Sequence, residues 1–105
     1  MIIRIFRARA KPGASEELRR LAEEISIPFV DREPGLVARY AGRGIGATGE
    51  ELVMITVWED LEAVKNMTGE EWDEPVIPDD RVGELINEMF LHQYETIGPV
   101  KPPSE

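Results

Sequence analysis

The pattern of hydrophobic positions is most distinctive in residues 51–60, whose sequence is ELVMITVWED. Residues 52–58 form the longest apolar or β-branched run of the chain, and such a run favours a β-strand that is buried on both faces. Successive side chains of a strand point to opposite faces. One face would carry Leu52, Met54, Thr56 and Trp58, and the other Val53, Ile55 and Val57. A sheet containing this strand therefore needs cover on both sides.

Periodicity predicts the other elements. Alternating residues indicate strands over 1–10, 36–41 and 88–97. Helical spacing of apolar residues indicates helices over 14–30 and 61–67, with a short helical turn from Asp79 or Asp80 through Leu85. Residues 70–80 have no clear period and are expected to cross the surface, held by Trp72, Val76 and Ile77.

Capping residues set the expected ends of these helices. Ser15 is expected to cap the first helix, and Pro28, which lacks a backbone N–H, to kink or end its regular part. Asp60 is expected to cap the second helix and Gly69 to terminate it.

The order strand, helix, strand, strand, helix, strand predicts an α+β fold of the ferredoxin-like βαββαβ type. Its four-stranded antiparallel sheet would carry both helices on one face. The domain would span residues 1–97, followed by a loose tail, 98–105. Because Val53, Ile55 and Val57 are too apolar to stay wet, we expect the other face to pair with a second subunit.

Charge and composition limit the classes of binding partner that we expect for this protein. The 105 residues include 21 acidic and 12 basic ones, a net charge of −9 that disfavours nucleic acid. There is no cysteine and no apolar run near the ~20 residues of a membrane span, so we expect a cytoplasmic protein without membrane contact. Arg4, between isoleucines, is expected to extend its charged end to solvent at the edge of the sheet.

A family resemblance is carried by Lys11-Pro12-Gly13, by Glu33-Pro34-Gly35, and by ITVWED followed by LEA over residues 55–63. With these motifs, residues 1–97 resemble the antibiotic-biosynthesis monooxygenase (ABM) domain of the dimeric α/β-barrel superfamily. The resemblance implies a homodimer, a ligand pocket between sheet and helices, and oxidation of a small aromatic or quinone-like compound without metal or flavin. The alternative is a non-catalytic small-ligand-binding or stress-response dimer on the same fold.

Departures from the family pattern limit what carries over. Haem-degrading members use an asparagine on the first strand, about where Phe6 stands, and a histidine after the second helix, whereas no histidine precedes His92 here. Haem degradation by that mechanism is therefore not expected. Aromatic oxygenases place an asparagine shortly before the tryptophan, where this chain has Met54 and Thr56. Only Trp58 matches cleanly.

The candidate site follows from the strand alternation. We expect a pocket between the helix-covered face and the helices, bordered by Phe6, Trp58 and Asn66, although Trp58 also fits a core position. His92, the only histidine, is the candidate base; a structural role at a dimer interface is the alternative.

Trp72 and Tyr94 are further candidates for contact with the ligand. Trp72 would act as a lid or anchor its loop, and Tyr94 would contribute to an aromatic wall beside His92. With one histidine and no cysteine, no transition-metal site is expected. The family resemblance implies that no cofactor is needed.

Overall fold

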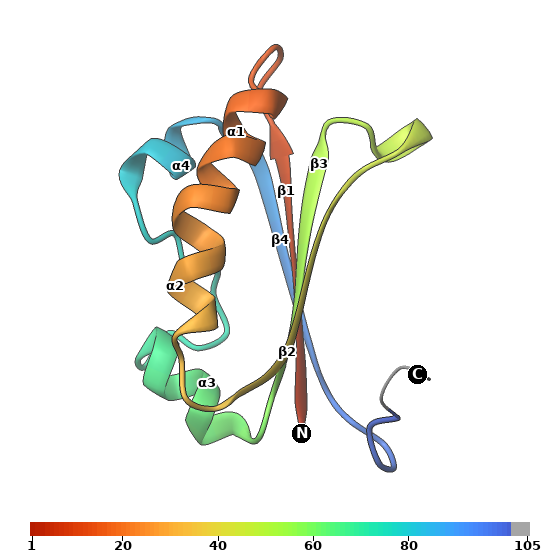
Figure 1. The fold of residues 1–105 in the computed structure, drawn as a ribbon, viewed down its shortest axis with the longest axis vertical. Helices are drawn as coiled ribbons and strands as arrows, with labels where there is room; N and C mark the ends of the chain where they lie inside the picture. Colours follow the sequence, from red (N-terminus) through yellow and green to blue (C-terminus); the bar gives the residue numbers. More distant parts are fainter. Residues whose placement is uncertain (102–105) are drawn as a thin grey trace.

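A four-stranded antiparallel sheet forms one layer of the protein, whose computed structural model describes residues 1–101. The strands lie in the order β2-β3-β1-β4. They span Ile2–Ala10 (β1), Leu36–Arg43 (β2), Glu51–Trp58 (β3) and Ile86–Glu95 (β4). All the labelled helices lie against one face of this sheet (Figure 1). The predicted ferredoxin-like α+β fold is confirmed, and part of the expected tail, residues 102–105, lies outside the described residues.

The first helix spans nearly the residues that the sequence predicts for it, but its hydrogen bonding changes along its length. It runs without a break through α1 (Ser15–Leu21), the π-helical segment η1 (Ala22–Ser26) and α2 (Ile27–Asp31). Pro28 offers no N–H to the preceding turn, and the Ile27 N–H donates to the Ala22 carbonyl, five residues back. The irregularity predicted at Pro28 is thus a change of hydrogen-bond spacing just before it.

Caps confirm two predictions and correct one. Asp60 accepts a hydrogen bond of 2.9 Å from the Ala63 N–H and begins α3 (Leu61–Thr68). Asp79 accepts one of 2.9 Å from the Arg81 N–H at the start of α4 (Asp80–Glu84). The prediction for Ser15 was wrong, because Ser15 lies inside α1 and no side chain caps that helix.

The strand register divides the side chains between two faces. Phe6 of β1 pairs with Met54 of β3, and the neighbouring Ile5 pairs with Ile55. Residues of β1 on the same face as Phe6 pack against the helices, since Ala8 packs with Leu18 and Leu21 in one core cluster. We call the opposite side of the sheet, which none of the labelled helices covers, the open face. It presents Ile3, Ile5, Val53, Ile55, Val57, Phe90, His92 and Tyr94.

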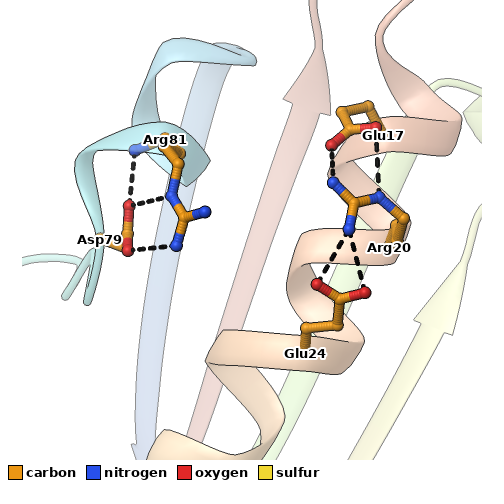
Figure 2. A network of polar contacts seen from close by, with 5 residues as sticks. All are labelled: Glu17, Arg20, Glu24, Asp79 and Arg81. Atoms are coloured by element: carbon orange, nitrogen blue, oxygen red, sulfur yellow. Dashed lines mark hydrogen bonds and ion pairs between the residues drawn. The ribbon is translucent and has the colours of Figure 1, made fainter.

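The outer side of the first helix is a charged, solvated surface. Figure 2 shows Arg20 between Glu17 and Glu24, with the Asp79–Arg81 pair of α4 nearby. The hydrogen bond from Arg20 lowers the pKa of Glu17. Exposed pairs of this kind contribute little to stability. Any apolar site on this helix must therefore lie on its inner side.

Gly35, the residue before β2, packs closely against Ala63 of α3. A Cβ placed on Gly35 would lie 2.2 Å from the Ala63 Cβ and 3.3 Å from its Cα. We expect Gly35→Ala to lower the free energy of unfolding by about 1–3 kcal/mol, because overpacking forces neighbouring backbone to move. Urea unfolding measures the change.

Gly83→Ala is the matched control, since its Cβ would meet the Ile77 Cγ2 at an ordinary 3.5 Å. Alanine is favoured over glycine in a helix by about 1 kcal/mol, so this variant should equal or exceed the parent in stability. Adding Ala63→Gly to Gly35→Ala should recover part of the loss. Wild-type stability of Gly35→Ala would contradict the close contact of the two elements.

Candidate functional site

A cavity of about 540 Å³ lies between the first helix and the helix-covered face of the sheet. We call it the outer cavity. Its size falls in the range usual for small-ligand sites. Its walls are mainly apolar side chains of β1, β3 and the first helix: Phe6, Ala8, Leu18, Ala22, Leu52 and Met54. This arrangement suits a small compound with little polar surface.

Charged side chains at the margin of the outer cavity are already paired with one another. Arg39 forms a two-point ion pair with Asp31, at 2.9 and 3.0 Å, which lowers the pKa of that carboxyl. Arg19 donates to Glu23 at 2.9 Å, and both belong to the lining. The margin is therefore polar, while the interior offers few hydrogen-bonding groups.

A second cavity, of about 60 Å³, is lined in part by the buried residues Arg4, Val30 and Thr56. We call it the inner cavity. It has room for about two water molecules. Arg4 and Thr56 line it together with Phe29, Met67, Val76 and Ile77. The two cavities share the wall residues Phe6, Ser26, Met54 and Val82, so they lie next to each other.

The prediction that the charged end of Arg4 reaches solvent is wrong. Its residue surface is only 5% exposed, since it points from β1 toward the helices. Its Nη1 donates to the Trp72 carbonyl at 2.7 Å and to the Gln93 Oε1 at 2.8 Å, and its Nη2 to the Glu74 carbonyl at 2.7 Å. The segment before α4 folds over the strand and supplies two of these acceptors. Burial lowers the pKa of Arg4 to about 10, which leaves it charged at neutral pH.

Trp58 lies in the core, not beside either cavity. It is 0% exposed and packs with Val30, Ala63 and Val64. Its Nε1 donates to the Thr56 Oγ1 at 2.8 Å. The prediction that Trp58 borders the pocket is therefore wrong, and the core position that its sequence context also allowed is the one observed.

Two further candidates from the second half of the chain lie outside both cavities. Asn66 is exposed on α3, so the predicted border at this residue is also wrong. Trp72 is half-buried against the cluster around Trp58, and its carbonyl accepts from Arg4 and Gln93. It anchors its loop and does not line a cavity wall.

His92 and Tyr94 lie on the open face. His92 pairs with Ile5 and Tyr94 with Ile3, so both point away from the helices, and both are exposed in the single chain. Neither lines the two cavities. Of the six predicted site residues, the structure brings only Phe6 to a cavity wall, where it borders both.

Sequence reasoning missed Arg4 as a buried residue that lines a cavity. The signal was present, because a charged residue whose strand neighbours are isoleucines must either leave the sheet or be buried with partners. Within residues 1–101, no three His, Cys, Asp or Glu side chains gather in a metal-binding group. In that same part of the chain, no helix has the length and apolar character needed to cross a membrane.

Together, the one-sided helical layer and the cavity beneath it define an α+β protein of the ferredoxin-like class with a pocket between its layers. The sequence model of the Antibiotic biosynthesis monooxygenase (ABM) family matches residues 1–71. The chain belongs to this family. The matched region includes Arg4, Phe6 and Met54.

Solved structures share this fold at low identity. Rv0793 from Mycobacterium tuberculosis is 20% identical, with 95% of this chain and 98% of that chain covered and a TM-score of 0.71. An antibiotic biosynthesis monooxygenase is 17% identical, with 93% and 100% covered and a TM-score of 0.72. A mutant of MhuD with two manganese protoporphyrin IX molecules per active site is 18% identical, with 97% and 100% covered and a TM-score of 0.67. No curated protein matches the chain.

Because Trp58 lies in the core, its substitution should change the stability of the protein but not its affinity for a ligand. Trp58→Phe should lower the free energy of unfolding by about 1–3 kcal/mol, because it leaves a gap and removes the donor to the buried Thr56 hydroxyl. Affinity for an aromatic probe such as 1-naphthol should stay within twofold, as measured by fluorescence titration. Loss of probe affinity with unchanged stability would place Trp58 at the site after all.

Proposed function

We propose that this protein binds a small aromatic or quinone-like compound in the outer cavity and oxidises it with molecular oxygen, without metal or flavin. The supporting observation is the apolar cavity of about 540 Å³ between sheet and helices, in a chain of the ABM family. Flat aromatic compounds match such walls, because their faces bury apolar area without leaving polar groups unpaired.

The chemistry would depend mainly on the substrate. Loss of a proton from a hydroquinone or anthrone leaves an electron-rich anion that reacts with oxygen directly. The protein would hold that anion in one orientation and keep bulk water away. The apolar walls around Phe6 and Met54 suit both the orientation of the anion and the exclusion of water.

Binding without turnover is the second candidate function, and one observation favours it. Within residues 1–101, Glu23 is the only carboxylate that lines either cavity, and it is engaged by Arg19 at 2.9 Å. His92, the candidate base, lies on the open face. A protein that only sequesters its ligand needs no base in the pocket.

Filling the outer cavity should abolish the function. Ala22 lines this cavity from the first helix, so Ala22→Phe would occupy the space of a ligand ring. We expect the wild type to consume oxygen with at least one member of a panel of hydroquinones and anthrones, and the variant to lose at least tenfold in rate. An oxygen electrode measures the rate, with the spontaneous oxidation subtracted.

Glu24→Phe is the matched control. Glu24 lies close by on the same helix but is exposed and bonded to Arg20, so this variant should keep the wild-type rate. Ligand-dependent increases in melting temperature without oxygen uptake would support the binding function instead. Equal rates in wild type and Ala22→Phe would show that the reaction occurs elsewhere.

We also propose that two copies of the chain pair through their open faces. Ile5, Val53 and Ile55 form an apolar strip there, and Tyr40 and Tyr94 beside it are 55% and 53% exposed. An apolar sheet face of this kind is usually covered, and a twofold axis places the same strip on both partners. Such a dimer would bury His92 near the interface, the structural role that its sequence also allowed.

Ile55→Glu should split this dimer, because the new carboxylate would be buried without a partner. Sedimentation velocity at micromolar concentration should show a dimer for the wild type and a monomer or unfolded chain for the variant. Ile45→Glu, at a position 85% exposed in the β2–β3 loop, is the control and should remain dimeric. A monomeric wild type would refute the proposal.

A further inference from the structure

Arg4 carries a buried positive charge that no ion pair within residues 1–101 neutralises. Its three hydrogen bonds to these residues go to neutral oxygens, two backbone carbonyls and the Gln93 amide. Arg19 and Arg20, by contrast, are on the surface and each pairs with two carboxylates. Among residues 1–101, no carboxylate forms an ion pair with Arg4. Buried charges are normally paired with opposite charges, so this one lacks an anion.

The guanidinium of Arg4 also keeps donors free. It has five N–H groups, of which the three hydrogen bonds use three. Its Nε has no acceptor within the described residues. Yet no fully buried side-chain nitrogen of these residues lacks a partner, so Nε still faces accessible space. Because Arg4 lines the inner cavity, that space is the natural place for a further acceptor.

The inner cavity offers no competing charge. Arg4 is its only ionisable wall residue in the part of the chain that the structure describes, and apolar side chains such as Phe29, Met67 and Ile77 make most of the rest. In such apolar surroundings an anion and a cation attract each other more strongly than in water. The cavity, of about 60 Å³, holds a ligand oxygen and the ring edge that carries it, but no second ring.

We propose that Arg4 is the anion-binding residue of the ligand site, and that the ligand is an aromatic compound with a weakly acidic hydroxyl, bound as its phenolate. The ring body would lie in the outer cavity, and its oxygen would enter the inner cavity to accept hydrogen bonds from Arg4. On binding, the hydroxyl O–H bond breaks, its electron pair stays on the oxygen, and the proton leaves to water. The site then needs no basic side chain, which accounts for the position of His92 on the open face.

This inference rests on the ligand-binding part of the proposed function, and the wild-type protein tests it directly. The probe is 4-nitro-1-naphthol, whose phenolate has a separate absorption band. A cation beside the bound oxygen lowers the pKa of the hydroxyl by about 1–3 units, whereas an apolar cavity without a cation raises it. We expect a decrease of at least about one unit, a tenfold gain in the bound phenolate fraction at low pH. An unchanged or raised pKa overturns the proposal.

Substitution of Arg4 provides a second test of the proposal. Arg4→Gln should weaken binding of the phenolate at least tenfold and leave binding of the neutral methyl ether, 1-methoxy-4-nitronaphthalene, within twofold. Arg4→Lys, which keeps the charge, should retain an intermediate affinity. Arg7→Gln is the matched control on the same strand, since Arg7 lies on the open face with Glu51 and should not affect either probe. Thermal unfolding checks that each variant is folded.

The outcomes separate the two proposals. If the wild type binds the methyl ether as tightly as the phenolate, ligand binding stands and the role of Arg4 is refuted. If the wild type binds neither probe, the proposed function fails together with the inference. If Arg4→Gln does not fold, the pKa of the probe bound to the wild type still decides, because that measurement needs no variant.

Discussion

The central position of β1 in the sheet is the constraint on which the rest of the structure depends. It pairs with β3 on one side and β4 on the other, and one register fixes the facing of every side chain on all three strands. A shift of one residue would exchange the faces, placing Ile5 under the helices and Arg4 and Phe6 on the open face. The core around Ala8 and Leu18, the outer cavity and the apolar strip of the open face all require the register observed.

Arg4 connects that strand to the most irregular part of the chain. Two of its hydrogen bonds reach the carbonyls of Trp72 and Glu74, in a segment without regular structure between α3 and α4. The same segment then supplies Val76 and Ile77 to the inner cavity. A single buried guanidinium thus positions a loop and lines a cavity. The stability of this loop and the polarity of the inner site are therefore coupled through one side chain.

The two sides of the sheet differ in character. On the helix side, Phe6, Met54 and the first helix enclose the outer cavity. On the open side, an apolar strip lies beside a charged group in which Glu51 forms ion pairs with Arg7 and Arg9. Family membership supports the proposed class of chemistry, while the contacts around Arg4 support the proposed position of a ligand's charge. Fold likeness alone would supply the first of these and not the second.

Much of the fold follows from local sequence. The alternation in residues 51–58 determined which side chains share a face, and Asp60 and Gly69 set the ends of α3 because capping depends only on neighbouring backbone. The predicted last strand, 88–97, lies two residues further along than the observed Ile86–Glu95, since its start depends on α4 and on pairing with β1. Phe6 lines the outer cavity because β1 turns this face to the helices, whereas alternation alone groups Phe6 with Arg4 and Ala8 without fixing their side of the sheet.

Tertiary structure decided the remaining features of the site. Whether Trp58 lined the pocket or filled the core depended on how closely α2 and α3 approach it, and they bury it completely. The facing of His92 depended on the register of β4 against β1, which residues far apart in the sequence determine. Arg4 is buried because Trp72, Glu74 and Gln93 supply acceptors from about 70 to 90 residues away. Periodicity reports which face a side chain takes, but only the packed structure reports what meets it there.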